Sequence, residues 1–245
     1  MDKLELWCMD IEKKIKSIFI TKSLKGNRLK LKYNKLSKAI TIDKNKIFNE
    51  DYARLAGLTP DGSLIKDLMR IYFSQKKDVS KHDLFKKLLT KLFSPKATIL
   101  IKPWSIKGTE SYINSQTLAR FYYHIMEIPK SDEAMRVPSW VYKSKEKIKI
   151  AYLQEAFAME GTILKKLSEI RFVSKQEVFV NDIQKLLLSL KITSSITYAP
   201  RLKQPSGQYR VSIYSKKNFK EFKKIGFNDC AHKDRYKEHL KKYKL

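Results

Sequence analysis

The chain has 245 residues, 42% of them hydrophobic and 11% aromatic, which is enough apolar material for a core in one large or two small domains. Its only two cysteines, Cys8 and Cys230, exclude a disulfide framework, and no apolar run approaches the ~20 residues of a membrane span, so we expect a soluble, cytoplasmic protein. Lysine and arginine number 52 against 25 acidic residues, and the formal net charge of +27 is typical of proteins with a polyanionic partner. A ribosomal-type protein or a membrane-surface protein would show the same excess.

Residues 1–48 are expected to form a basic N-terminal extension. Leu4–Ile18 is amphipathic and predicts a helix, and Leu29–Tyr33 with Ala39–Ile42 predicts a hairpin whose turn is rich in lysine. We expect this extension either to enlarge the basic surface or to pack as a strap against the rest of the chain.

A unit of helix, two strands, helix, two strands and helix is expected from residue 49 onward. Its first helix, Asn49–Asp61, should stop at Gly62, since glycine readily takes the left-handed conformation that ends many helices. Apolar and polar residues alternate over Met69–Gln75, which predicts a half-buried strand. The remaining elements are expected as a helix from the cap Asp78 to Phe93, strands Thr98–Lys102 and Tyr112–Asn114 around Gly108, and a helix Gln116–Met126 capped by Ser115.

A second unit with the same element order is expected after a linker in which Pro129 and Pro138 restrict the backbone. Its elements are expected as a helix Lys147–Glu160, a strand Ser168–Ser174, a helix Asn181–Leu190, strands near Ser195–Ala199 and Gln208–Tyr214, and a helix Lys217–Lys224.

An internal duplication relates the two units. Residues 61–93 align without a gap to residues 160–192, with eleven identities in 33 positions, where this composition would give roughly three by chance. Gly62 with Gly161 and Lys76 with Lys175 are among the identities. We therefore divide the chain into the extension at 1–48, a first repeat with its linker at 49–145, and a second repeat at 146–245.

In both repeats the predicted first helix ends in an acid followed by glycine, Asp61-Gly62 and Glu160-Gly161. A carboxylate there lies at the negative end of the helix dipole, which costs about 0.3 to 1 kcal/mol. The same cost at duplicated positions is explained if these carboxylates and the terminal backbone carbonyls bind a divalent cation such as Mg²⁺ or Mn²⁺, which prefers oxygen ligands. Otherwise the two acids are exposed residues at helix ends.

Leu55–Ser63 and Leu153–Thr162 resemble the two signature helices of the LAGLIDADG homing endonuclease family. The resemblance covers about residues 49–245, and Phe73–Lys77 is similar to a strand end that carries polar active-site residues in single-chain archaeal members. It implies an α+β fold of pseudo-twofold tandem αββαββα repeats. Two antiparallel four-stranded sheets would then form a saddle over duplex DNA.

The resemblance further implies a monomeric, Mg²⁺-dependent endonuclease that makes a double-strand break with a short stagger. Asp61 and Glu160 would bind the metal. Lys76 and Lys175 would stabilise the charge on the reacting phosphate or assist water, and Gln75 and Ser174 would position that water. Ordinary phosphate contacts are the alternative role of the two lysines.

Groove contacts are expected from side chains that alternate away from the core. These are Arg70, Tyr72, Ser74, Lys102, Lys107, Arg171, Arg201, Lys203, Arg210 and Ser212. The opposite faces are expected to build the core through Ile71, Phe73, Ile170, Phe172, Val211 and Ile213. Phe121, Tyr122 and Tyr123 are expected to pack rather than to stack on bases.

Three residues depart from the signature. Pro60 removes a helical hydrogen bond, and Glu155 and Met159 replace small residues where the helices should touch. A buried Glu155 needs a partner such as a lysine, or a place at the helix rim. These departures keep two other functions open: a DNA-binding regulator that has lost the chemistry, and an RNA maturase that binds the structured RNA of the intron encoding it.

Overall fold

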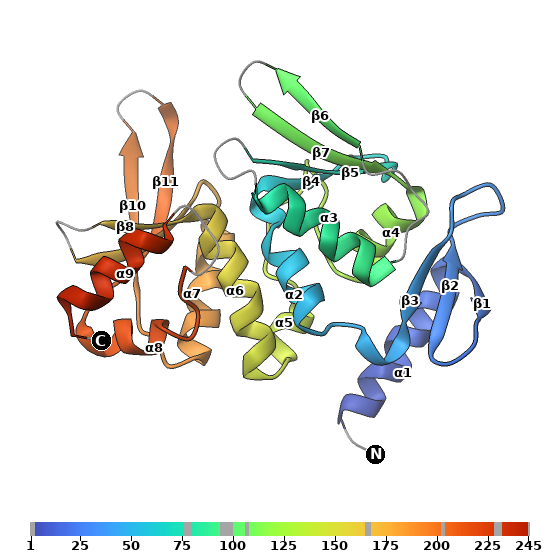
Figure 1. The fold of residues 1–245 in the computed structure, drawn as a ribbon, viewed down its shortest axis with the longest axis horizontal. Coiled ribbons are helices and arrows are strands. Elements are labelled where there is room, and N and C mark those ends of the chain that lie inside the picture. The colour runs from blue at the N-terminus through green and yellow to red at the C-terminus, as the bar shows by residue number, and fades with distance from the viewer. Residues whose placement is uncertain are drawn as a thin grey trace.

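The computed structural model describes residues 3–75, 80–93, 100–105, 108–164, 168–201, 204–227 and 232–244. Two four-stranded sheets lie on either side of a central pair of helices (Figure 1). A small N-terminal module lies next to the first repeat, at the end of the molecule opposite to the second repeat (Figure 1). Within the described ranges, no helix combines the length and apolar composition that crossing a membrane requires.

The N-terminal module is a helix and an antiparallel sheet in the order β1-β2-β3. The predicted hairpin is confirmed, with Leu29 opposite Ile42, and a strand that the sequence did not indicate, β1, pairs with its outer edge. The elements are α1 (Lys3–Ile18), β1 (Ile20–Ser23), β2 (Arg28–Lys32), β3 (Ile40–Asp43) and the 3-10 helix η1 (Lys44–Lys46).

The first repeat is built around a sheet in the order β4-β5-β7-β6. Ser115 caps its last helix by accepting a hydrogen bond from Leu118 N, as predicted. The elements are α2 (Glu50–Gly57), the 3-10 helix η2 (Thr59–Asp61), β4 (Gly62–Leu64), β5 (Arg70–Ser74), α3 (Ser80–Phe93), β6 (Leu100–Ser105), β7 (Gly108–Asn114) and α4 (Gln116–His124). Asp78, the predicted cap of α3, lies outside the described residues.

The second repeat has the equivalent strand order, β8-β9-β11-β10. Gly161 pairs with Phe172 in the register in which Gly62 pairs with Phe73, so the duplication seen in the sequence is also a structural repeat. The elements are α6 (Glu146–Glu160), β8 (Gly161–Leu164), β9 (Glu169–Ser174), α7 (Glu177–Ser189), β10 (Ser195–Arg201), β11 (Gln204–Ile213), α8 (Lys216–Phe222) and α9 (Lys233–Lys242), preceded in the linker by α5 (Ser139–Lys143).

One face of each sheet is buried against helices, as the alternation predicted. All six strand residues expected in the core are buried, which confirms that part of the sequence analysis. Phe121 and Tyr122 on α4 are also buried, and Tyr123 packs against the core, so the predicted packing role of this aromatic group is confirmed. The opposite sheet faces are therefore the ones open to a partner.

The first signature helix ends earlier than expected. The α-helix stops at Gly57 and a 3-10 turn carries the chain on to Asp61. Pro60 has no N–H to continue the helical hydrogen bonds, and the hydroxyl of Thr59 donates to Ala56 O at 2.6 Å instead. The second signature helix contains no proline and runs unbroken to Glu160.

Gly62 was predicted to take a left-handed conformation, and this was wrong. Its backbone is extended, with φ −112° and ψ 164°, and it begins β4 directly. Gly161 is also extended, with φ −86°. A Cβ on Gly161 would overlap Phe157 O and lie 2.9 Å from the ring of Phe227, so this glycine is required for space and not for a special backbone conformation.

Candidate nucleic-acid interface and acidic pair

The two signature helices pack directly against each other. They lie side by side between the two sheets (Figure 1). A Cβ added to Gly57 would overlap the carbonyl oxygen of Tyr152 and lie 3.0 Å from the Cβ of Glu155. The absence of a side chain at Gly57 therefore lets α2 approach the backbone of α6. From the sequence we expected this contact at Leu55, Ala56 and Pro60 and did not single out Gly57.

Glu155 is buried beside this contact and has two cationic partners. Its Oε2 accepts a hydrogen bond from Lys81 Nζ at 2.8 Å, and its Oε1 lies 3.5 Å from Nη1 of Arg54. The side chains of Lys81 and Glu155 are only 2% and 4% exposed. The expectation that a buried Glu155 would find a lysine is confirmed.

The ends of the two signature segments converge at one edge of this helix pair. The 3-10 turn that ends at Asp61 packs against α6, whose last residue is the half-buried Glu160. The side chain of Asp61 lies outside the described part of the structure, so the position of its carboxylate is not described. The backbone thus places the two signature ends on neighbouring elements.

Gln75 reaches this edge from the end of β5. Its Nε2 lies 3.9 Å from Sδ of Met159, the residue before Glu160. The carbonyl of Gln75 is 3.0 Å from Nε2 of the buried His82, whose Nδ1 lies 2.6 Å from Ser111 Oγ. A side chain of the first repeat is thereby held against the end of the second signature helix.

Two other predicted polar residues lie at the end of the equivalent strand, β9. Ser174 ends β9, and its hydroxyl accepts a hydrogen bond from Gln176 N at 3.2 Å. Lys175 comes next and is exposed. Lys76, its partner in the duplication, lies outside the described residues.

The open face of the first sheet carries a pre-arranged arginine. Arg70 Nε donates to Oδ1 of Asn114 at 2.7 Å, and its guanidinium lies 4.7 Å from the centre of the Tyr112 ring. Tyr72 and Ser74 are half-buried on the same face. Lys102 lies in β6 but its side chain is not described, and Lys107 lies outside the described residues.

On the second sheet, the predicted groove residue Arg171 is held by a buried acid. Its Nε and Nη2 each donate to a carboxylate oxygen of Glu169 at 2.7 Å. Burial raises the pKa of Glu169, but hydrogen bonds from Arg171 and Ser212 outweigh this effect and keep the pKa below its ordinary value. Ser212 is buried and donates to Glu169, so its hydroxyl is not open to a groove, and our expectation for this residue was wrong.

The remaining predicted contacts of this sheet fall on the β10–β11 hairpin, with Arg210 on the inner strand β11 and Arg201 on the edge strand β10. Arg210 is half-buried, and among the described residues nothing accepts a hydrogen bond from its buried Nε. Arg201 lies at the end of β10 with its side chain undescribed, and Lys203 lies outside the described residues.

Comparison with known proteins agrees with this architecture. A family model described as a LAGLIDADG-like domain matches residues 147–226, which run from α6 past α8. Solved structures of the homing endonuclease I-DmoI, in complex with DNA and Ca and with DNA and Mn, superpose with a TM-score of 0.54 at 18% identity. They cover 73% of this chain, and this chain covers 90% and 97% of them. The chain has the LAGLIDADG fold.

Two further matches show how far the similarity extends. The full-length DUF199/WhiA protein from Thermatoga maritima superposes with a TM-score of 0.51 at 13% identity, over 80% of this chain and 61% of that one. Among curated proteins, the probable translation initiation factor IF-2 of Methanocaldococcus jannaschii is 25% identical over 101 residues, which are 40% of this chain and 9% of that protein. At these identities the solved structures establish the LAGLIDADG fold alone.

The donor set at the ends of the signature helices suits a hard divalent cation. Glu160 would supply a carboxylate at the C-terminus of α6, where helix carbonyls beyond Phe157, whose oxygen accepts from Gly161 N, have no further turn to bond to. Within the described ranges, no group of three or more His, Cys, Asp or Glu side chains gathers. A cation here would therefore draw on one carboxylate from each repeat together with backbone carbonyls, water or phosphate oxygens.

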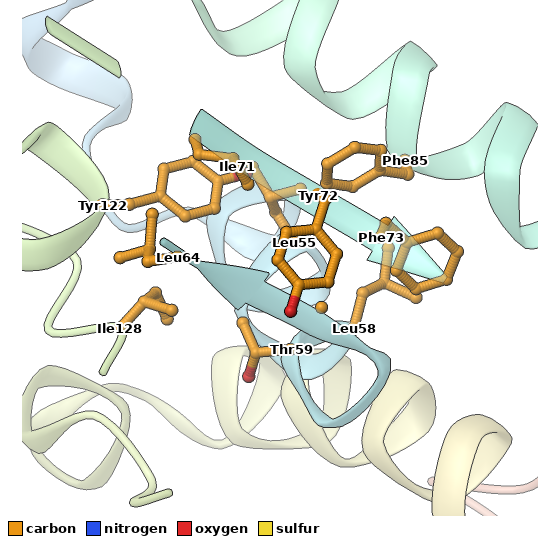
Figure 2. A pocket seen from close by; sticks show the side chains of 11 residues that line it. Leu55, Leu58, Thr59, Leu64, Ile71, Tyr72, Phe73, Phe85, Tyr122 and Ile128 are labelled. Carbon is orange, nitrogen blue, oxygen red and sulfur yellow. The ribbon is translucent and has the colours of Figure 1, made fainter. Parts of the chain in front are cut away.

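A small pocket lies inside the first repeat, beneath β4 and β5. Figure 2 shows mainly apolar side chains around it, among them Leu55, Leu64 and Phe85. The hydroxyl of Thr59 is already bonded to the backbone. This pocket is a gap in the core of the LAGLIDADG fold and offers no set of polar groups that would orient a ligand.

From the sequence we did not identify the buried polar residues that bind Glu155, Gln75 and Arg171. Lys81 and His82 were assigned only to an amphipathic helix, although both are buried and polar. Glu169 was not singled out either. The one available signal was the charge pattern, because a buried Glu155 requires a cation, but the sequence does not show which of the many lysines approaches it.

Proposed function

We propose that this chain binds duplex DNA across its two sheets and cleaves both strands at a specific site with the help of a divalent cation. The supporting observation is the equivalence of Asp61 and Glu160, which end the two signature segments on elements that pack together. The proposal takes the repeats as residues 49–145 and 146–245, each presenting one sheet to one half of the site.

The open sheet faces would provide the binding surface. Positive side chains on these faces contact phosphates and base edges, while the buried faces keep each sheet rigid. The proposed contacts are Arg70, Tyr72, Ser74, Lys102, Lys107, Arg171, Arg201, Lys203 and Arg210. Arg70 and Arg171 are already oriented by Asn114 and Glu169, so they lose less side-chain entropy when they bind.

The proposed chemistry assigns one task to each group at the signature ends. Asp61 and Glu160 would hold Mg²⁺ or Mn²⁺, which when bound polarises the phosphate and lowers the pKa of water. Lys76 and Lys175 would stabilise the negative charge that develops on the reacting phosphate. Gln75 and Ser174 would orient the attacking water by hydrogen bonding.

A non-catalytic DNA-binding protein is the second candidate. The observation that favours it is the unequal construction of the two ends: Asp61 follows Pro60 on a 3-10 turn, whereas Glu160 ends a regular α-helix. Two acids placed differently can fail to hold cations in equivalent positions. Such a protein would still bind duplex DNA through its sheets.

The test begins with selection of a preferred site from a randomised duplex library, followed by incubation of plasmid carrying that site with and without Mg²⁺. We expect linear product only with Mg²⁺. Asp61→Asn and Glu160→Gln should lose it and keep duplex affinity, and Asp10→Asn, an exposed acid on α1, is the matched control.

The other outcomes separate the two candidates. Cleavage retained by either signature variant shows that the two-acid assignment is wrong. Tight, site-specific binding without cleavage by the unmodified protein supports the non-catalytic candidate.

A further inference from the structure

The sheet of the N-terminal module presents an exposed basic face. Leu29, Leu31, Ile40 and Ile42 point inward and are buried. The opposite face of the same strands carries Ile20, Lys22, Arg28, Lys30, Lys32, Thr41 and Asp43, which we call the β1–β3 face. In all, residues 3–48 contain 13 lysines and arginines and 4 acidic residues.

Like charges are placed directly opposite each other on this face. Lys22 of β1 pairs across the strands with Lys30 of β2, and Lys32 lies two residues further along β2. Directly opposed like charges destabilise an antiparallel pair. Asp43 lies opposite Arg28 at one end of the face, but the centre of the face, at Lys22 and Lys30, is suited to a partner that supplies negative charge.

The lysines at the centre of the face have no acidic partner. Among the described residues, neither Lys22 nor Lys30 takes part in an ion pair, and both are exposed. Lys16 and Lys46 of the same module do pair, with Glu12 and Asp43. Glu12 and Asp43 are thus engaged by other lysines, away from Lys22 and Lys30.

The module is held firmly against the first repeat. Thr117 Oγ1 of α4 donates to Lys38 O at 2.8 Å and accepts from Tyr33 N at 3.1 Å. The ring of Phe48 stacks on Trp140 with 4.4 Å between ring centres. The β1–β3 face is therefore a fixed surface and not a tethered domain.

The position of the module along the molecule extends the proposed DNA path. Both four-stranded sheets and the module follow one another along the longest axis, with the module beyond the first repeat (Figure 1). A duplex that crosses both sheets and continues past the first repeat approaches the module. Phosphates of that flanking duplex provide the repeating negative charge that Lys22, Lys30 and Lys32 lack.

We propose that the β1–β3 face is a second, sequence-independent binding site for duplex DNA, and that it contacts the phosphates flanking the site read by the two sheets. The proposal rests on duplex binding by the sheets but not on cleavage. It predicts that the footprint of the full chain is longer than the two sheets alone would cover, and that the additional contacts are purely electrostatic.

The experiment compares the full chain with the triple variant Lys22→Gln/Lys30→Gln/Lys32→Gln on two duplexes carrying the selected site. One duplex has about 20 base pairs and the other about 40, so only the longer one reaches past the sheets. The matched control, Lys216→Gln/Lys217→Gln/Lys220→Gln, removes the same charge from exposed positions on α8, which lies on the far side of the molecule from the β10–β11 hairpin (Figure 1).

We expect the triple variant to bind the long duplex roughly tenfold or more weakly, with a salt slope reduced by about 2 to 3, because each phosphate contact contributes about 0.9 to that slope. Its affinity for the short duplex and the behaviour of the control should change much less. Equal losses on both duplexes, or no loss on the long one, would overturn the proposal. The same comparison made on a structured RNA at matched salt adds one outcome: a loss seen only there would also overturn the proposal.

The same experiment distinguishes failure of duplex recognition by the two sheets from failure of the flanking site. If the unmodified chain binds neither duplex above background, duplex recognition by the sheets is wrong. If it binds both and the triple variant matches it, only the flanking site is wrong. Circular dichroism of the variant checks that the module remains folded, since all three lysines lie on its outer face.

Discussion

Lys81 Nζ lies 2.8 Å from Oε2 of Glu155, and both side chains are almost fully buried. Lys81 is on α3 of the first repeat and Glu155 is on α6 of the second, so this ion pair joins the repeats beside the contact of their signature helices. A buried pair is costly to break because the remaining charge has no water to solvate it. We therefore consider it a constraint on how the two repeats fit together.

Replacement of Lys81 by methionine tests this constraint. Among the described residues, Lys81→Met leaves Glu155 with Arg54 as its cation, whose side chain is 36% exposed and 3.5 Å away. We expect a loss of about 3 to 5 kcal/mol in the free energy of unfolding, measured by denaturation in urea at neutral pH. The double variant Lys81→Met/Glu155→Leu should recover most of that loss, since both charges are gone. A double variant as unstable as the single one would contradict a role for the charge.

Two glycines near the signature ends should respond differently to the same substitution. A Cβ on Gly57 would overlap Tyr152 O, whereas a Cβ on Gly62 would lie 3.4 Å from its nearest neighbour, Tyr72 O. We expect Gly57→Ala to destabilise the protein by about 1 to 3 kcal/mol through forced separation of α2 and α6. Gly62→Ala should cost much less, because its backbone is extended and space is present. Thermal unfolding of both variants gives the comparison, and equal effects would contradict the close helix contact.

Much of the fold could be predicted because the signals are periodic or repeated. Alternation placed Ile71 and Phe73 in the core, and the 99-residue offset predicted that the second repeat would use Ile170 and Phe172 in the same way. The partner of Glu155 could be predicted by type, since a buried carboxylate without a cation is too costly.

The predictions that failed concern details that depend on contacts beyond one local pattern. The end of α2 depends on a competition between Pro60, which breaks the helical hydrogen bonds, and Thr59, whose hydroxyl replaces the missing donor. Ser212 has the alternation of an open position, but Glu169 and Arg171 from the neighbouring strand cover it. Neither outcome can be predicted from the local pattern of one segment.

The Glu169–Arg171 pair predicts a pH dependence of stability. The folded-state pKa of Glu169 lies below its ordinary value, so its contribution is present above the unfolded-state pKa and is lost as the pH falls through the folded-state value. At pH 7, Glu169→Gln should lower the free energy of unfolding by about 1 to 3 kcal/mol. The difference from the unmodified protein should shrink as the pH is lowered through the acidic range. Urea denaturation at a series of pH values measures it, and a difference that grows on acidification would contradict the assignment.

Lys175 offers a test that separates catalysis from simple phosphate binding. It is exposed directly after β9, next to Ser174, so its substitution should leave the fold intact. If it stabilises charge in the reaction, Lys175→Gln should slow single-turnover cleavage of the selected site by roughly 10- to 1000-fold while duplex affinity changes little. The control Lys185→Gln removes an exposed lysine from α7 and should change neither quantity. A fall in affinity with an unchanged rate for bound DNA would instead assign Lys175 to an ordinary phosphate contact.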